Sequence, residues 1–154
     1  MKIRKHMCIW LFEKSKIPYS KLFKTNKLAW NLTNRQLLNF PSTTLGYRLG
    51  HFLATNNFSL IPKLERHDAY HVITGYGTKI EEEISLQYFL FGNGKRSFYL
   101  FGVAILGFLI LPEYSKLYLQ SYKHGKSCSP ISQFNIKESL SLSLNQIQSK
   151  LHLK

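Results

Sequence analysis

Near its middle the chain contains the run Arg66-His67-Asp68-Ala69-Tyr70-His71-Val72-Ile73-Thr74-Gly75-Tyr76-Gly77, with Glu83 six residues further on. His67 and His71 are spaced i,i+4, so a helix over residues 64–74 places both imidazoles one turn apart on one face. The two glycines that follow interrupt this helix, and a second helix is predicted from residue 79 to residue 91. The pattern therefore predicts two antiparallel helices joined by a glycine elbow.

Four side chains of this hairpin are candidate metal ligands. Asp68 stands i,i+3 from His71 and joins the histidine face. On a helical wheel, Glu83 lies among the apolar residues of its helix, whereas the two preceding acids lie on the opposite arc. A carboxylate on an apolar face is costly unless it is paired or bound to a metal. A straight helix would separate His71 from Glu83 by about 18 Å, so the chain must turn back at the glycines. The predicted ligands are His67, Asp68, His71 and Glu83.

The same residues also allow simpler interpretations. An i,i+4 histidine pair is often a surface coincidence or a hydrogen-bonded core pair, and three consecutive acids are typical of a solvated first helical turn. Asp68 can orient an imidazole instead of binding the metal itself. If a metal binds, imidazole and carboxylate ligands suit zinc, iron or manganese. The pattern differs from the zinc-protease motif His-Glu-x-x-His, because Asp68 follows the first histidine.

Length and hydropathy patterning indicate a compact, single-domain, all-α bundle around this metal site. A chain of 154 residues with 44% hydrophobic residues is long enough to build one core without disulfides. No strand-like alternation stands out. Residues 1–42 are predicted to form a lysine-rich arm and residues 43–154 the helical domain. The further predicted helices cover residues 45–55, 98–111 and 113–123 (ending at Gly125), and a helix-like apolar stripe in the tail.

The charge of the chain favours phosphate-bearing partners. Lys and Arg number 21 against 8 Asp and Glu, which gives a formal net charge of +13. In residues 1–30 the lysines alternate with aromatic residues, as in a solvated, partly helical arm or a helix lying on a membrane surface. The aromatic residues concerned are Trp10, Phe12, Tyr19, Phe23 and Trp30. No nucleic-acid module is recognisable, so no specific nucleic acid is expected as partner.

The most apolar stretch of the chain, residues 98–111, carries fourteen residues and two glycines. It is too short to span a bilayer, which takes about 18 residues. The first apolar run, from Cys8, is too short for a signal peptide. The stretch is therefore predicted to be a buried or interfacial helix. A core helix is the favoured interpretation, and a helix that lines an apolar slot is the alternative. In that alternative, Leu86, Leu90, Ile105 and Phe108 would wall a lipid-binding groove beside Glu83.

Together these residues resemble a known family, the coenzyme Q (ubiquinone) biosynthesis protein 4 family. The central motif carries the likeness, which extends from about residue 43 to residue 151. It includes Leu45-Gly46-Tyr47-Arg48-Leu49-Gly50-His51 upstream and Tyr122-Lys123-His124-Gly125 with Pro130 downstream. The sequence departs from the family at Ala69-Tyr70, where Trp often precedes the second histidine, in the tail at Asn135-Ile136-Lys137-Glu138, and in its short lysine-rich N-terminal arm.

The resemblance implies a function and a location. It implies a divalent metal, zinc in the family, on His67, Asp68, His71 and Glu83, with iron, manganese and magnesium as alternatives. It implies a peripheral protein on the cytoplasmic membrane face that acts on polyprenylated ring intermediates of ubiquinone biosynthesis. The implied chemistry is decarboxylation with hydroxylation at ring carbon C1, as a lyase-type oxidative decarboxylation. Other quinone-biosynthesis proteins or a second copy are expected partners.

A second hypothesis is a non-catalytic protein. In this alternative the chain binds a prenyl lipid or quinone intermediate, or it organises a biosynthetic complex as a scaffold. The metal would then hold a phosphate or ring oxygen while the groove holds the tail.

Overall fold

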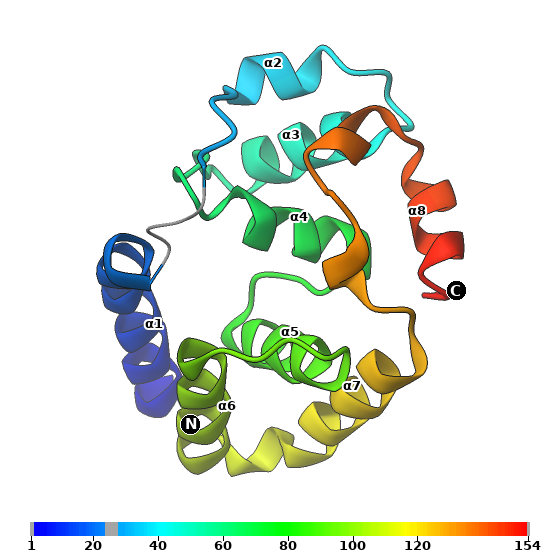
Figure 1. Ribbon diagram of the computed structural model, residues 1–154. Helices are drawn as coiled ribbons and strands as arrows, with labels where there is room; N and C mark the ends of the chain where they lie inside the picture. Colours follow the sequence, from blue (N-terminus) through cyan, green and yellow to red (C-terminus); the bar gives the residue numbers. More distant parts are fainter. Residues whose placement is uncertain (1, 24–27, 154) are drawn as a thin grey trace. The chain divides into compact units, whose positions relative to one another are not determined.

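The computed structural model describes residues 2–23 and 28–153, and within them every regular element is helical (Figure 1). The α-helices are α1 Lys2–Phe23, α2 Asn34–Leu38, α3 Leu45–Thr55, α4 Glu65–Thr74, α5 Ile80–Gly92, α6 Phe98–Ile110, α7 Ser115–Ser127 and α8 Leu144–Lys150. Short 3-10 helices cover Pro112–Tyr114, Ile131–Gln133 and Glu138–Ser141. The predicted all-α class is confirmed.

The chain forms two compact units that are not continuous in sequence. The α5–α7 unit combines the described parts of residues 1–25 with residues 76–130. The α3–α4 unit combines the described parts of residues 26–75 with those of residues 131–154. The predicted division of the chain at residue 42 stays a prediction.

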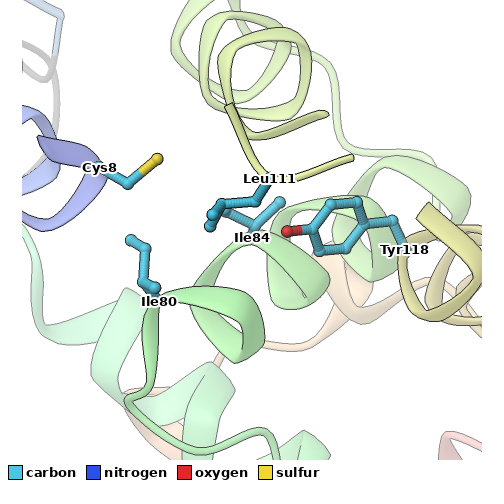
Figure 2. Close-up of a cluster of buried hydrophobic side chains, with 5 residues drawn as sticks. All are labelled: Cys8, Ile80, Ile84, Leu111 and Tyr118. Carbon is cyan, nitrogen blue, oxygen red and sulfur yellow. The ribbon is translucent and has the colours of Figure 1, made fainter. Parts of the chain in front are cut away.

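The core of the α5–α7 unit is an apolar cluster to which α1, α5 and α7 all contribute. Figure 2 shows its buried members, Cys8, Ile80, Ile84, Leu111 and Tyr118. Cys8 comes from α1, so the N-terminal helix is part of this core. Two ion pairs also attach α1, from Arg4 to Glu113 at 3.1 Å and from Lys5 to Glu81 at 2.9 Å.

Helices α5 and α7 pack with their backbones in close approach. A Cβ atom added at Gly92 would lie 2.0 Å from the Tyr122 carbonyl oxygen, and one added at Gly125 would lie 2.0 Å from that of Phe89. Only glycine permits this spacing. The predicted end of the last long helix at Gly125 is therefore wrong, because that glycine serves helix packing and α7 continues to Ser127.

The end of α7 is instead set by Asn93, the C-cap of α5. Its buried side-chain amide donates to the Gly125 and Ser129 carbonyl oxygens, each at 3.0 Å. Those carbonyls lie at or just beyond the last turn of α7, where a helix lacks internal donors. Asn93, at the C-terminal end of α5, therefore supplies hydrogen-bond donors to the carbonyl groups at the C-terminal end of α7.

The apolar helix predicted at residues 98–111 is buried on one side only, so the core interpretation is correct for that side and wrong for the other. In α6 the buried residues are Leu100, Ala104 and Gly107, all on one side. The opposite side is exposed, with Phe98 85% and Leu109 67% accessible. Its composition predicted a helix correctly, but a helix in which every side is apolar gives no pattern from which to read the buried side.

In the α3–α4 unit, α3 begins at the predicted place, because the Thr44 hydroxyl accepts from the Tyr47 amide as N-cap. Helix α4 begins at Glu65, three residues after Pro62 and one residue after its predicted start at residue 64. Lys63 between them has a φ of 70°, which cannot continue a right-handed helix. The apolar residues predicted in the tail help to close this unit, with Ile136, Leu140, Ile147 and Leu151 buried.

Candidate metal centre

Helix α4 is fixed within its unit from both ends. At its start, the buried carboxylate of Glu65 accepts from the backbone amide of Trp30 at 2.9 Å. At its end, Gly75 adopts φ 79° and donates its amide to the His71 carbonyl at 2.8 Å. The Gln148 side-chain amide of α8 donates to the Ile73 carbonyl at 2.9 Å. A Gly with positive φ is a common helix stop, so the predicted glycine elbow begins where expected.

His67 and His71 meet side by side on this helix. Their Nε2 atoms lie 3.2 Å apart, and the ring planes are nearly perpendicular, at 89°. Two nitrogens bound to one tetrahedral zinc at about 2.0–2.1 Å each would be about 3.3 Å apart. The same separation suits an N–H···N hydrogen bond between the rings, so the pair is already close to the spacing that chelation requires.

The ring of His71 is held from a second side by Phe52 of α3. The two rings are stacked, with centroids 5.6 Å apart and an angle of 16° between their planes. His71 is only 3% exposed. The role of Phe52 could not be predicted, because nothing in a linear sequence indicates which ring a distant aromatic residue will contact.

Glu83 occupies the first turn of α5 and is 6% exposed. The two preceding acids, Glu81 and Glu82, interact with other groups. Glu81 pairs with Lys5, and the Glu82 carboxylate accepts from the Lys79 backbone amide at 3.3 Å. The helical wheel thus separated Glu83 correctly from its neighbours. A buried carboxylate at the start of a helix also benefits from the positive end of the helix dipole.

Three of the four predicted ligands, His67, His71 and Glu83, make up a group that could hold a metal ion. Asp68 is half-buried and does not belong to this group. Two imidazoles and one carboxylate form a ligand set used by catalytic zinc sites, which leave a fourth position open. The residues therefore fit the metal that the resemblance implied.

The four residues predicted to wall a lipid groove differ in exposure. Leu86 and Leu90 of α5 are fully buried, whereas Ile105 and Phe108 of α6 are exposed. Phe108 lines a cavity of about 400 Å³ with Tyr88 and Tyr118. Their common groove beside Glu83 stays a prediction.

A different apolar cavity, of about 240 Å³, lies between α1, α5 and α6. Its lining includes Cys8, Leu11, Ile84, Val103 and Leu106. This cavity could not be predicted from the sequence, because it depends on how α1 packs, and residues 1–42 were predicted to form an arm.

Fold and ligand chemistry together define an all-helical protein with a candidate His/Glu metal site. The profile of the family described as Coenzyme Q (ubiquinone) biosynthesis protein Coq4 matches residues 60–154, and the chain belongs to this family. Membership implies involvement in ubiquinone biosynthesis. Among curated proteins, no match was found.

A solved structure has the same fold. It is the crystal structure of a candidate ubiquinone biosynthesis protein from Nostoc punctiforme PCC 73102, and it superimposes with a TM-score of 0.69 at 18% identity. The match covers 98% of this chain and 82% of that one. At this identity the likeness supports the fold alone, including α1, which lies outside the residues that the family profile matches.

Proposed function

We propose that this protein is a metal-binding, membrane-associated component of ubiquinone biosynthesis that acts on the carboxylate-bearing ring of a polyprenylated intermediate. The observation that carries the proposal is the group of His67, His71 and Glu83, in a chain of this family. Two of these side chains are almost fully buried. Groups with ligating chemistry in such surroundings are expensive to maintain unless they serve binding.

The polar ring and the apolar tail of such a substrate have separate counterparts on α5. Ile80 and Ile84 line the 240 Å³ cavity, and Glu83 lies between them in sequence, within one turn. A prenyl chain in the cavity would therefore bring its ring toward the first turn of α5. The cavity is lined almost entirely by apolar side chains, as binding of a hydrocarbon chain requires.

The chemistry proposed is loss of the ring carboxylate. As the bond between ring carbon and carboxylate breaks, carbon dioxide leaves and the electron pair stays on the ring, where a proton from solvent then takes the place of the carboxylate. A bound divalent metal supplies electrostatic stabilisation of such developing negative charge. Zinc is redox-inert, so hydroxylation of the same carbon would require dioxygen and a separate electron donor, and the proposal covers the decarboxylation only.

The first experiment measures metal content. His71→Ala and Glu83→Gln should each lose bound zinc in titration calorimetry and metal analysis, while Glu82→Gln, a neighbouring acid outside the group, should keep it. Circular dichroism checks that each variant remains helical. Cells that depend on His71→Ala should fail to make quinone. Retained zinc together with full quinone levels in that variant would refute the proposal.

The carrier or scaffold hypothesis is distinguished by native mass spectrometry of the purified protein. An enzyme converts a ring-carboxylated prenylated precursor to a product lighter by carbon dioxide. A carrier retains the same precursor unchanged. The apolar cavity and the histidine pair at chelating distance are compatible with both hypotheses, so the mass of the bound molecule decides between them.

A further inference from the structure

Helix α6 presents an apolar side to solvent. Phe98, Ile105 and Leu109 are spaced so that they share one side of the helix, and they are 85%, 59% and 67% exposed. Leu106 and Phe108 flank them and are about half-exposed. A single exposed apolar residue is ordinary, but a continuous helical face of large apolar side chains marks an interaction surface. We call the five residues the α6 surface.

Helix α1, which packs beside α6 (Figure 1), also exposes apolar side chains. Ile3, Met7 and Trp10 are spaced along one side, while Cys8 faces the core. Trp10 is 58% exposed. An exposed tryptophan beside apolar residues is typical of a boundary between hydrocarbon and water, because its ring is apolar and its N–H is a donor.

The charge around these two helices is positive. The α5–α7 unit contains 13 Lys and Arg against 5 Glu within residues 1–25 and 76–130. Two of those acids are already paired, Glu81 with Lys5 and Glu113 with Arg4. Exposed Lys2 and Lys14 lie on α1, and exposed Arg96 immediately precedes α6. Anionic headgroups complement such a surface.

Length and charge decide between a bilayer and a second copy of the chain as the occupant of this surface. No single helix within the described residues is long and apolar enough to cross a membrane. By length and composition alone, α6 and the segment Pro112–Ser127, bent from each other by 105°, could together form a broken span. At 13 residues α6 is about 20 Å long, shorter than the hydrocarbon core of about 30 Å. Two copies meeting through this surface would bring two strongly positive units together.

We propose that the α6 surface, flanked by α1, docks on an anionic lipid bilayer, with α6 lying in the interface and its apolar side inserted. This inference rests on the proposed function, because it identifies the surface through which the protein would reach a polyprenylated substrate in the membrane. Apolar insertion and headgroup attraction act together, so binding weakens with salt without disappearing.

The test uses the full-length protein and vesicles of phosphatidylcholine with 30% phosphatidylglycerol, compared with pure phosphatidylcholine. The wild-type protein should sediment with the anionic vesicles and much less with the neutral ones. Phe98→Ser/Ile105→Ser/Leu109→Ser should lower the partition coefficient at least tenfold. The control variant Leu28→Ser/Leu38→Ser/Leu142→Ser removes three exposed apolar side chains from the other unit and should stay within twofold of wild type.

Two further measurements identify the surface itself. Brominated lipids in the vesicles should quench Trp10 and leave the buried Trp30 unquenched. Sedimentation equilibrium without vesicles should show the same monomer for wild type and the α6 variant. Absence of vesicle binding, unchanged binding by the α6 variant, or a dimer that this variant dissociates would each overturn the inference.

Metal binding separates this inference from the proposed function. The α6 variant should keep its zinc affinity, and His71→Ala should keep its vesicle binding. Failure of the membrane inference would leave the metal result intact, and the reverse also holds. The α6 variant should stay helical, because its three substituted positions are exposed in the structure. Circular dichroism checks this.

Discussion

Replacing Gly125 with alanine tests the packing of α5 against α7, on which the position of Glu83 depends. The new Cβ would lie 2.0 Å from the Phe89 carbonyl oxygen, whereas Cβ contacts under 3.0 Å are essentially never observed. The two helices must therefore separate by roughly 1 Å. A gap of that size forfeits about a quarter to a half of the dispersion energy of the atom pairs that it separates.

The expected loss follows from two opposing terms. Alanine in a helix interior is better than glycine by about 1 kcal/mol. Overpacking against backbone, which cannot rotate away as a side chain can, costs about 3 kcal/mol, the upper part of the usual range. The net destabilisation of Gly125→Ala is therefore about 2 kcal/mol, which lowers Tm by about 6 °C in a chain of this size.

Gly102→Ala is the matched control, because a Cβ at this α6 position meets no atom within 4 Å. It should gain helix propensity without a clash and raise Tm by about 3 °C. Thermal unfolding followed by circular dichroism measures both variants. A Tm for Gly125→Ala equal to that of the control would refute the close approach of the two backbones. Gly92→Ala repeats the test from α5, with a Cβ 2.0 Å from the Tyr122 carbonyl oxygen.

Three further outcomes are expected. Phe52→Leu removes the ring stacked on His71 and should weaken zinc affinity about tenfold, measured by calorimetry, with Tm falling by only a few degrees; unchanged affinity would leave Phe52 a packing residue only. Tyr118→Phe should raise Tm, because the buried hydroxyl has no hydrogen-bond partner within the described chain and its removal relieves about 1 kcal/mol; a lower Tm would reveal a bond to that hydroxyl. Burial alone would raise the pKa of Glu81, but the hydrogen bond and charge of Lys5 lower it below its usual value. Stability from this pair should therefore be present above the ordinary glutamate range and be lost as pH falls through the lowered pKa, and Glu81→Gln should flatten the dependence of Tm on pH below about 5.

Local signals in the sequence were sufficient to predict helices α4 and α5 and the glycine at which the first of them ends. The elbow depends on Gly75, whose positive φ only glycine adopts freely, and the helix starts at Leu45 and Phe98 depend on the hydroxyls of Thr44 and Ser97. The position of Glu83 on the buried side of its helix also followed from its immediate neighbours on the helical wheel. Each of these features is encoded within about one turn of the residue concerned.

Features that depend on distant contacts could not be predicted in this way. Gly125 has the appearance of a helix stop, and only the approach of α5 shows that it is a packing glycine. The buried side of α6 is set by Ile84, whose side chain would contact a Cβ at Gly107, and not by any alternation within α6 itself. The stacking of Phe52 on His71 joins two helices whose register the sequence does not specify.

The arrangement of α5 favours an amphiphilic ligand over the alternatives that net charge alone would permit. One turn of this helix carries a buried carboxylate, Glu83, and on either side of it Ile80 and Ile84, which line an apolar cavity. A buried carboxylate would repel the phosphates of a nucleic acid, and a purely apolar lipid would make no use of the Glu83 carboxylate. A molecule with an oxygen-bearing ring and a hydrocarbon chain would use both the carboxylate and the apolar cavity. If α6 inserts into a bilayer, the cavity that α6 and α1 line lies next to the lipid hydrocarbon, in which prenyl chains dissolve. The hydrophobic effect that drives membrane docking would then also bring the substrate to the cavity.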